Sequence, residues 1–216
     1  MNGQGIPVLT AILDVEAAAR HGWPPINLTK AFLKGGATFL QLRAKSIPSA
    51  EFLDTANAVV EIAHAGGARV IINDRADVAR LAHADGVHLG QEDITPAAAR
   101  AIVGVDAIVG ISAHTVDQID RALDQPVSYV ALGPVFGSVT KSTGYDRVGL
   151  VMVGEAAKRA RARGLPLVAI GGITLLTAPS VIDAGAASVA VIGDLLTTGD
   201  PEQRTREYLA RLGGPR

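Results

Sequence analysis

Short apolar runs, repeated along the chain and separated by alanine-rich segments, constrain the fold more than any other feature of this sequence. Each run is rich in valine, isoleucine and leucine, and each is short enough to be a β-strand buried on both faces. The runs are VLTAIL (8–13), TFLQLR (38–43), RVIIND (69–74), GVHLG (86–90), AIVGIS (107–112), YVALG (129–133), PLVAIGG (166–172) and SVAVIG (188–193). The segments between them have helical spacing, as at 48–66 and 149–164. This alternation predicts a parallel sheet covered by helices.

Helix start and stop signals support the same reading. Thr95 followed by Pro96 predicts an N-cap with proline at the first helical position, while Gly66-Gly67 and Gly164 predict helix ends. Eight strand candidates without a Ser/Gly-rich linker favour one (β/α)8 TIM-barrel domain over residues 1–216, near the lower size limit of that fold. The alternative is a doubly wound open sheet, but no GxGxxG follows the first strand to support dinucleotide binding.

The overall composition argues against several classes of function. A hydrophobic content of 48% is enough for a substantial core, and a net charge of −1 without a basic cluster argues against nucleic-acid binding. Cysteine is absent, which excludes a disulfide framework and a thiolate metal site. The chain starts without a signal-like segment and has no run near the roughly 18 apolar residues that span a membrane. We therefore expect a cytoplasmic protein with no membrane contact.

Polar residues end the apolar runs, and a TIM barrel places its active site at the C-terminal ends of its strands. The second run ends in Gln41, Arg43 and Lys45, which strand alternation puts on one side. Two cations and an amide on one face suggest an anionic ligand. A solvated strand end is the competing interpretation.

Carboxylates follow the third and fourth runs. Asn73-Asp74 ends the third, and Gln91-Glu92-Asp93 follows the fourth. Asp74 and one of the later acids are candidates to share Mg²⁺, which prefers carboxylate and phosphate oxygens. Alternatively, Asp74 caps a turn and the later acids precede the helix that starts at Thr95. His88, within the fourth run, is expected to pack against neighbours rather than bind a ligand.

The fifth and sixth runs lead to hydroxyl groups. Ser112 ends the fifth run two residues before His114, but no nucleophile elbow and no orienting acid accompany the pair, which disfavours covalent serine chemistry. The sixth run opens into a loop that contains Ser138, Thr140 and Lys141. Such a loop can surround a diphosphate, although its spacing is not that of a P-loop; a plain flexible loop is the alternative.

Glycines follow the last two runs, at Gly171-Gly172 and Gly193. TIM barrels commonly bind phosphate at this position through backbone N–H groups that lead into helix N-termini. Glycine that merely permits a tight turn is the alternative. The position of these glycines therefore favours a phosphate site after the last two runs.

Taken in order from about residue 8 to residue 196, these segments resemble the thiamine-phosphate synthase family. INDR followed by DGVHLGQED at this spacing is the most specific part of the match. The motifs that carry the resemblance are QLRAK (41–45), INDRADVA (72–79), DGVHLGQED (85–93), GISAHT (110–115), YVALGPVF and TK (129–141), AIGGI (169–173) and GAASVAVI (185–192).

The resemblance implies a transferase of thiamine biosynthesis that joins hydroxymethylpyrimidine diphosphate to a thiazole phosphate, giving thiamine phosphate and pyrophosphate. It also implies a role for each motif position. Mg²⁺ would be held by Asp74 and Asp93, and a homodimer is suggested. The implied catalytic residues are Arg43, Lys45, Ser112 and Lys141. The implied substrate-binding residues are these four with Gln41, Asn73, Ser138, Thr140, Gly172, Ile192 and Gly193.

The sequence departs from the family pattern at three places. Gly193 stands where serine is common, Gly137-Ser138 replaces a common Pro-Thr pair, and Asp194 adds a negative charge that would repel phosphate unless its side chain turns outward. Three alternatives remain: a thiazole tautomerase-like barrel, a non-catalytic phosphate-ligand-binding barrel, and a Schiff-base aldolase that uses Lys141. Retention of Arg43, Asp74, Asp93 and Lys141 together argues against the tautomerase.

Overall fold

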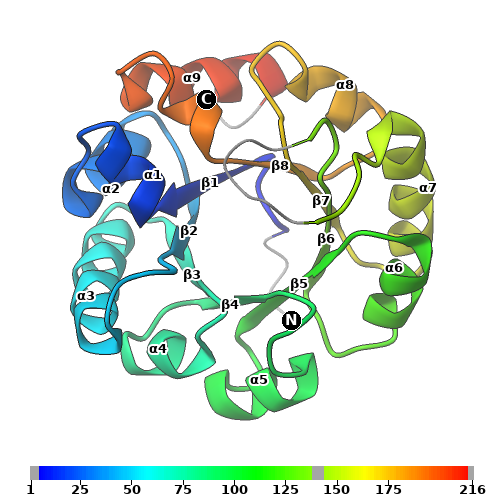
Figure 1. Cartoon of the computed structure of the whole chain (residues 1–216), viewed down its shortest axis with the longest axis horizontal. Helices are drawn as coiled ribbons and strands as arrows, with labels where there is room; N and C mark the ends of the chain where they lie inside the picture. The colour runs from blue at the N-terminus through cyan, green and yellow to red at the C-terminus, as the bar shows by residue number, and fades with distance from the viewer. Residues whose placement is uncertain (1–4, 138–143, 214–216) are drawn as a thin grey trace.

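The computed structural model describes residues 5–137 and 144–213 and shows a closed barrel of eight parallel strands (Figure 1). The strands pair in chain order from β1 to β8, and β8 pairs with β1 to close the barrel. They are β1 (Leu9–Asp14), β2 (Phe39–Arg43), β3 (Arg69–Asn73), β4 (Gly86–Leu89), β5 (Ile108–Ala113), β6 (Tyr129–Leu132), β7 (Leu167–Ile170) and β8 (Ser188–Val191). All eight predicted runs are confirmed, and the closed barrel excludes the open doubly wound sheet.

Helices form a ring outside the barrel (Figure 1). They are α1 (Val15–Arg20), α2 (Pro25–Lys34), α3 (Ser49–Ala65), α4 (Ala76–Leu81), α5 (Pro96–Val103), α6 (Val116–Leu123), α7 (Gly149–Ala162), α8 (Ala178–Asp183), the 3₁₀ helix η1 (Gly193–Leu195) and α9 (Pro201–Leu212). No helix in the described ranges is long and apolar enough to cross a membrane.

Local signals set the helix boundaries. Thr95 caps α5 by accepting a hydrogen bond from the backbone N–H of Ala98, with Pro96 in the first turn, as its sequence predicts. Gly66 follows the last residue of α3, also as predicted. The seventh strand is shorter than its apolar run because Gly171 (φ +100°) and Gly172 (φ +67°) leave the β region of backbone conformation.

The apolar core fills the barrel and the layer between the strands and helices. The strand residues are almost all buried on both faces, which explains why their sequences are continuous apolar runs rather than alternating patterns. Some polar side chains are also buried, among them Gln41, Asn73 and His88 near the C-terminal ends of β2, β3 and β4. The barrel therefore becomes polar toward the ends of its strands.

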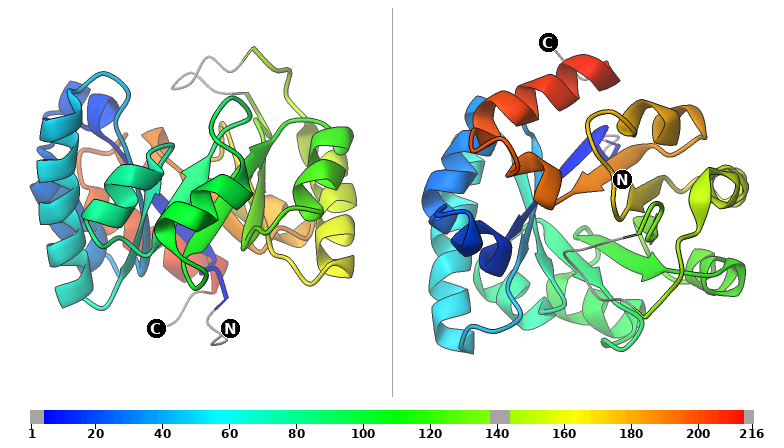
Figure 2. Two further views of the ribbon diagram at one scale, coloured as in Figure 1. Left: turned by 90° about the horizontal axis from the view of Figure 1, so that it is seen from below. Right: turned by 45° about the horizontal axis from the view of Figure 1, so that its top comes forward.

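Both ends of the described chain lie on the same face of the barrel (Figure 2). β1 starts on this face, and α9, which runs back alongside the barrel, ends on it. The loops that follow the strands emerge from the opposite face.

Candidate active site

A cavity of about 700 Å³ opens at the C-terminal ends of β5 to β8. Ser112, Gly172, Ile192 and Gly193, which lie far apart in the sequence, all line it. A pocket of this size accommodates a small organic phosphate. The structure therefore brings four of the predicted site residues to one wall of the barrel mouth.

The cations at the C-terminal end of β2 pair with carboxylates. The guanidinium group of Arg43 pairs with the buried carboxylate of Asp14 at the end of β1, and the ammonium group of Lys45 pairs with Asp74 after β3. Gln41, on the same side of the strand, is buried within the barrel. Among the described residues, the buried Nε atom of Arg43 has no hydrogen-bond partner.

Glu16, a residue of α1, fixes the backbone of the loop that carries Lys45. The carboxylate of Glu16 in α1 accepts hydrogen bonds from the backbone N–H groups of Lys45 (2.7 Å) and Ser46 (2.8 Å). Burial on its own would raise the pKa of Glu16, but these N–H groups and the charge of Arg43 hold the pKa below its usual value. Glu16 thus stays charged and anchors the β2–α3 loop.

Asp74 and Asp93 come together beside Lys45, with Asp74 in a left-handed conformation (φ 66°). Burial would raise the pKa of Asp74, but hydrogen bonds with Lys45 and Asp93 lower it below the usual value. Burial raises the pKa of Asp93, and the hydrogen bond with Asp74 and the charge of Asp74 raise it further. The hydrogen bond from the Gly90 backbone N–H (2.7 Å) acts in the opposite direction and lowers the pKa. Glu92 has no such partner among the described residues.

This pair of carboxylates fits Mg²⁺. Magnesium is usually held by one or two carboxylates together with substrate phosphates and water, rather than by an all-protein cage. Consistent with that, the described residues contain no group of three or more His, Cys, Asp or Glu placed to hold a metal. Two carboxylates that share a proton at close range are also stabilised when a cation replaces that proton.

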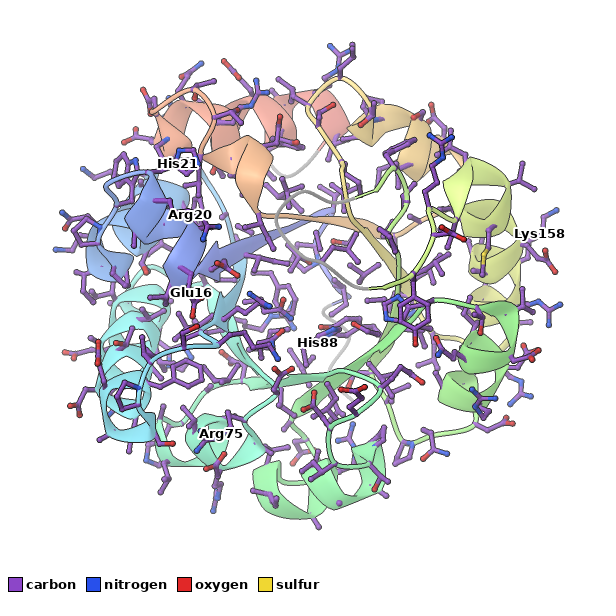
Figure 3. The ribbon with its side chains drawn as sticks, viewed as in Figure 1. Glu16, Arg20, His21, Arg75, His88 and Lys158 are labelled. Carbon is purple, nitrogen blue, oxygen red and sulfur yellow. The ribbon has the colours of Figure 1, made fainter. Side chains whose placement is uncertain are left out.

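His88, and not His114, is the partner of Ser112. His88 Nε2 lies 2.9 Å from Ser112 Oγ, and His88 Nδ1 lies 2.7 Å from Tyr129 Oη (Figure 3). His88 is packed inside the barrel, as expected. His114 instead has its Nδ1 2.5 Å from the carbonyl oxygen of Gly133 and its ring stacked on Tyr145.

The group on the far side of His88 is a phenol and not a carboxylate. Full burial raises the pKa of Tyr129 far above its usual range, so its hydroxyl stays protonated. This arrangement orients the Ser112 hydroxyl, but the group that contacts His88 Nδ1 is the Tyr129 hydroxyl rather than the carboxylate of a hydrolytic triad.

Free backbone donors lie on the opposite wall of the mouth. The N–H groups of Gly172 and Gly193 have no acceptor among the described residues. Gly172 must be glycine because its φ is +67° and a Cβ there would lie 2.1 Å from the carbonyl oxygen of Gly137. Two free N–H groups at the cavity wall are suitable donors for phosphate oxygens.

Asp194 also lines the cavity, but its carboxylate is bonded toward α9 and Leu175. Its Oδ2 atom accepts hydrogen bonds from Tyr208 (2.6 Å), Arg204 (3.0 Å) and the backbone N–H of Leu175 (3.0 Å). The repulsion of phosphate expected from its sequence position is therefore offset, because the carboxylate turns toward α9 and a cation neutralises it.

Three predicted residues, Ser138, Thr140 and Lys141, lie outside the described residues. Several site residues were not predicted: Asp14, Glu16, Arg20 and His21 from the first strand and helix, and Tyr129 from β6. Asp14 directly follows the first apolar run, which is the signal that identified Asp74. No sequence signal distinguishes Glu16 or Arg20 from other charged residues on exposed helices.

Comparison with known proteins identifies similar sequences and structures. The family model described as thiamine monophosphate synthase matches residues 12–195. A thiamine-phosphate synthase from a Roseiflexus species is 40% identical over 199 residues, 92% of this chain and 82% of the relative. One from Chlorobium luteolum is 37% identical over 216 residues, 100% of this chain and 98% of the relative. The solved structure of a thiamine phosphate pyrophosphorylase from Pyrococcus furiosus superposes with a TM-score of 0.85 at 26% identity, covering 95% of this chain and 96% of that one.

Proposed function

The chain belongs to the thiamine monophosphate synthase family, and we propose that it is a Mg²⁺-dependent transferase that joins the hydroxymethylpyrimidine group of a pyrimidine diphosphate to a thiazole phosphate. The products are thiamine phosphate and pyrophosphate. One observation carries the proposal most directly: the Asp74–Asp93 carboxylate pair and the free N–H groups of Gly172 and Gly193 lie at the same barrel mouth. The carboxylate pair suits a diphosphate with its metal ion, and the two N–H groups suit a monophosphate.

The wall formed by β2, β3 and β4 binds the diphosphate in this proposal. Arg43 and Lys45, which pair with Asp14 and Asp74, neutralise the charge that develops on the leaving pyrophosphate. Bound between Asp74 and Asp93, Mg²⁺ would supply further charge neutralisation to the diphosphate oxygens. Gln41 and Asn73, buried near the strand ends, are placed to contact the pyrimidine ring.

The reaction is a dissociative substitution. The bond between the methylene carbon and the diphosphate oxygen breaks, and its electron pair leaves with pyrophosphate. The resulting pyrimidine methylene cation is stabilised by resonance, and the lone pair of the thiazole nitrogen then forms the new carbon–nitrogen bond. No protein nucleophile is needed, so the chain contributes mainly positioning and electrostatics.

Ser112 lines the cavity together with Gly172 and Gly193, and its hydroxyl contacts His88. This places a hydroxyl group next to the reacting centres, where it helps to fix the orientation of the substrates. The phosphate held at Gly172 and Gly193 keeps the thiazole ring in place for attack.

The test is direct. Purified protein is mixed with both substrates with Mg²⁺ and, separately, with a chelator, and both products are measured. We expect equal amounts of thiamine phosphate and pyrophosphate with Mg²⁺ and strongly reduced amounts with the chelator. No product with Mg²⁺ would sink the synthase proposal, whereas full activity with the chelator would sink its metal part. Conversion of a thiazole phosphate without any diphosphate would instead indicate a tautomerase.

A further inference from the structure

Arg20 is the last residue of α1 and lines the same cavity as Gly172, Ile192 and Gly193. Closure of the barrel brings it there. β1 pairs with β8, with Ala11 opposite Val191, so the helix that follows β1 comes close to the loop that follows β8. Figure 3 shows Arg20 and His21 on the part of α1 that is next to η1.

The guanidinium group of Arg20 is available to a ligand. The side chain is exposed and forms no hydrogen bond or ion pair with any residue that the structure describes. This distinguishes it from Arg43 and Lys45, each of which is paired with a carboxylate, and neither of which lines this cavity.

The charge balance of the cavity wall favours an anion beside Arg20. Within the described ranges, the charged residues that line the cavity are Arg20 and Asp194. Asp194 is neutralised by Arg204 and holds the hydroxyl of Tyr208, so its negative charge is directed into α9. Arg20 therefore supplies positive charge to the cavity that also holds the free backbone N–H donors of Gly172 and Gly193.

We propose that Arg20 binds the phosphate group of the thiazole substrate, alongside the backbone N–H groups of Gly172 and Gly193. Gly193 offers no side-chain donor, so a cation at this wall supplies interactions that glycine lacks. Guanidinium matches phosphate geometry because it donates two parallel hydrogen bonds. The proposal rests on the proposed function for the identity of the substrate, but not for the presence of a phosphate site.

Kinetics with the Arg20→Ala variant test the assignment. We expect the KM for the thiazole phosphate to rise about tenfold, the usual effect of losing a charge-assisted hydrogen bond, while kcat and the KM for the pyrimidine diphosphate hold. Arg80→Ala is the matched control. Arg80 is also exposed in the last turn of a short helix, α4, but it does not line this cavity. An unchanged KM for the thiazole phosphate, or a rise confined to the diphosphate, would overturn the proposal.

A second variant tests rescue. Gly193 is not among the glycines with positive φ, so serine is compatible with its backbone. Gly193→Ser in the Arg20→Ala background is expected to recover part of the lost affinity by adding a hydroxyl donor at the same wall. If both variants fold but the added serine recovers no affinity, Arg20 does not act at the wall that contains Gly193.

Calorimetry with inorganic phosphate separates this inference from the synthase proposal. Inorganic phosphate should bind the unaltered protein and should bind Arg20→Ala about tenfold more weakly, irrespective of catalysis. Equal binding to both proteins would refute the role of Arg20 while leaving the synthase proposal intact. Weaker binding without any synthase activity would support the phosphate site and refute the synthase.

Discussion

His88 on β4 and Ser112 on β5 are joined by a 2.9 Å contact between Nε2 and Oγ. The strand register explains it. His88 is paired with Gly110, and Ser112 lies two residues further along β5, on the same side of the strand. Gly110 in turn is paired with Tyr129, whose hydroxyl contacts the other nitrogen of His88. A polar chain thus crosses three strands inside the barrel.

Gly110 makes room for this chain, and Gly110→Ala is expected to disrupt it. A Cβ at this position would lie 2.1 Å from the Tyr129 ring, which is fully buried and has little space to move. We expect a loss of roughly 2–4 kcal/mol in the free energy of unfolding, typical of overpacking that also breaks a buried hydrogen bond. Denaturant unfolding measures it. Gly5→Ala is the control, since a Cβ there meets nothing within 4 Å; equal stability of the two variants would contradict the packing argument.

Asp14→Asn should separate two roles of one carboxylate. Asp14 Oδ1 caps α1 by accepting a hydrogen bond from the Ala17 N–H (2.8 Å), and Asp14 Oδ2 pairs with Arg43. Asparagine keeps an acceptor for the cap but removes the charge that neutralises Arg43. We expect a loss of about 1–3 kcal/mol in stability, less than for a fully buried pair because solvent reaches part of Arg43.

Pyrophosphate should bind this variant at least as tightly as the unaltered protein, because Arg43 no longer has a competing carboxylate. Calorimetric titration gives the affinity. Asp14→Ala, which also removes the cap, should cost about 1 kcal/mol more. A markedly weaker affinity for pyrophosphate in Asp14→Asn would mean that Asp14 is essential to hold Arg43 in place.

Asp93→Asn is expected to abolish Mg²⁺-dependent turnover while leaving the fold intact. Asparagine retains an oxygen that accepts the Gly90 N–H, but it cannot balance the charge of a cation. Mg²⁺ should raise the melting temperature of the unaltered protein in the presence of pyrophosphate and should do so far less for the variant. Glu92→Gln is the matched control, and loss of activity in it would weaken the assignment of Asp93.

The two acids should also give opposite pH dependences. The pKa of Asp74 is lowered, so its contribution to stability is present above its unfolded pKa and is lost as the pH falls through its folded pKa. The pKa of Asp93 is raised in the folded state. The folded state therefore loses stability as the pH rises from the unfolded pKa through this raised pKa and Asp93 becomes charged. Without metal, Asp93→Asn should therefore be at least as stable as the unaltered protein at neutral pH, and the difference should shrink in acid.

Mg²⁺ binding should weaken as the pH falls through the raised pKa of Asp93, because a proton and the cation compete for the same oxygens. Calorimetric titrations across the acidic range measure this dependence. An affinity that does not change with pH would show that Asp93 is not a ligand.

Asp194→Asn should lower stability without improving phosphate binding. The carboxylate accepts hydrogen bonds from α9 and from Leu175, and Arg204 keeps only Glu207 as a charged partner when the charge of Asp194 is removed. We expect a cost of about 1–3 kcal/mol, measured by denaturant unfolding, and an unchanged affinity for inorganic phosphate. A large gain in phosphate affinity would show that the carboxylate does face the ligand.

The barrel was predictable because each strand is a continuous apolar run that ends at glycine or at a polar residue. The positions of Asp74, Asp93 and Gly172 followed from the same rule, since strand ends meet at one barrel mouth. The partners of these residues did not follow. Sequence proximity suggested His114 for Ser112, whereas strand register provides His88, which lies 24 residues earlier.

Arg20 illustrates a second limit of prediction from the sequence. Its place beside η1 depends on the pairing of the first strand with the last, a contact between the two ends of the sequence. Asp194 illustrates a third, because its charge could be judged only once Arg204 and Tyr208 of α9 were located around it. Composition and periodicity carry no information about either contact.

The shared position of the two chain ends has a consequence for attachment. Since β1 begins and α9 finishes on the face opposite the barrel mouth, a partner domain or affinity label joined to either end would emerge away from the entrance used by both substrates. Fusion to either end, or immobilisation through it, should therefore leave substrate access unobstructed.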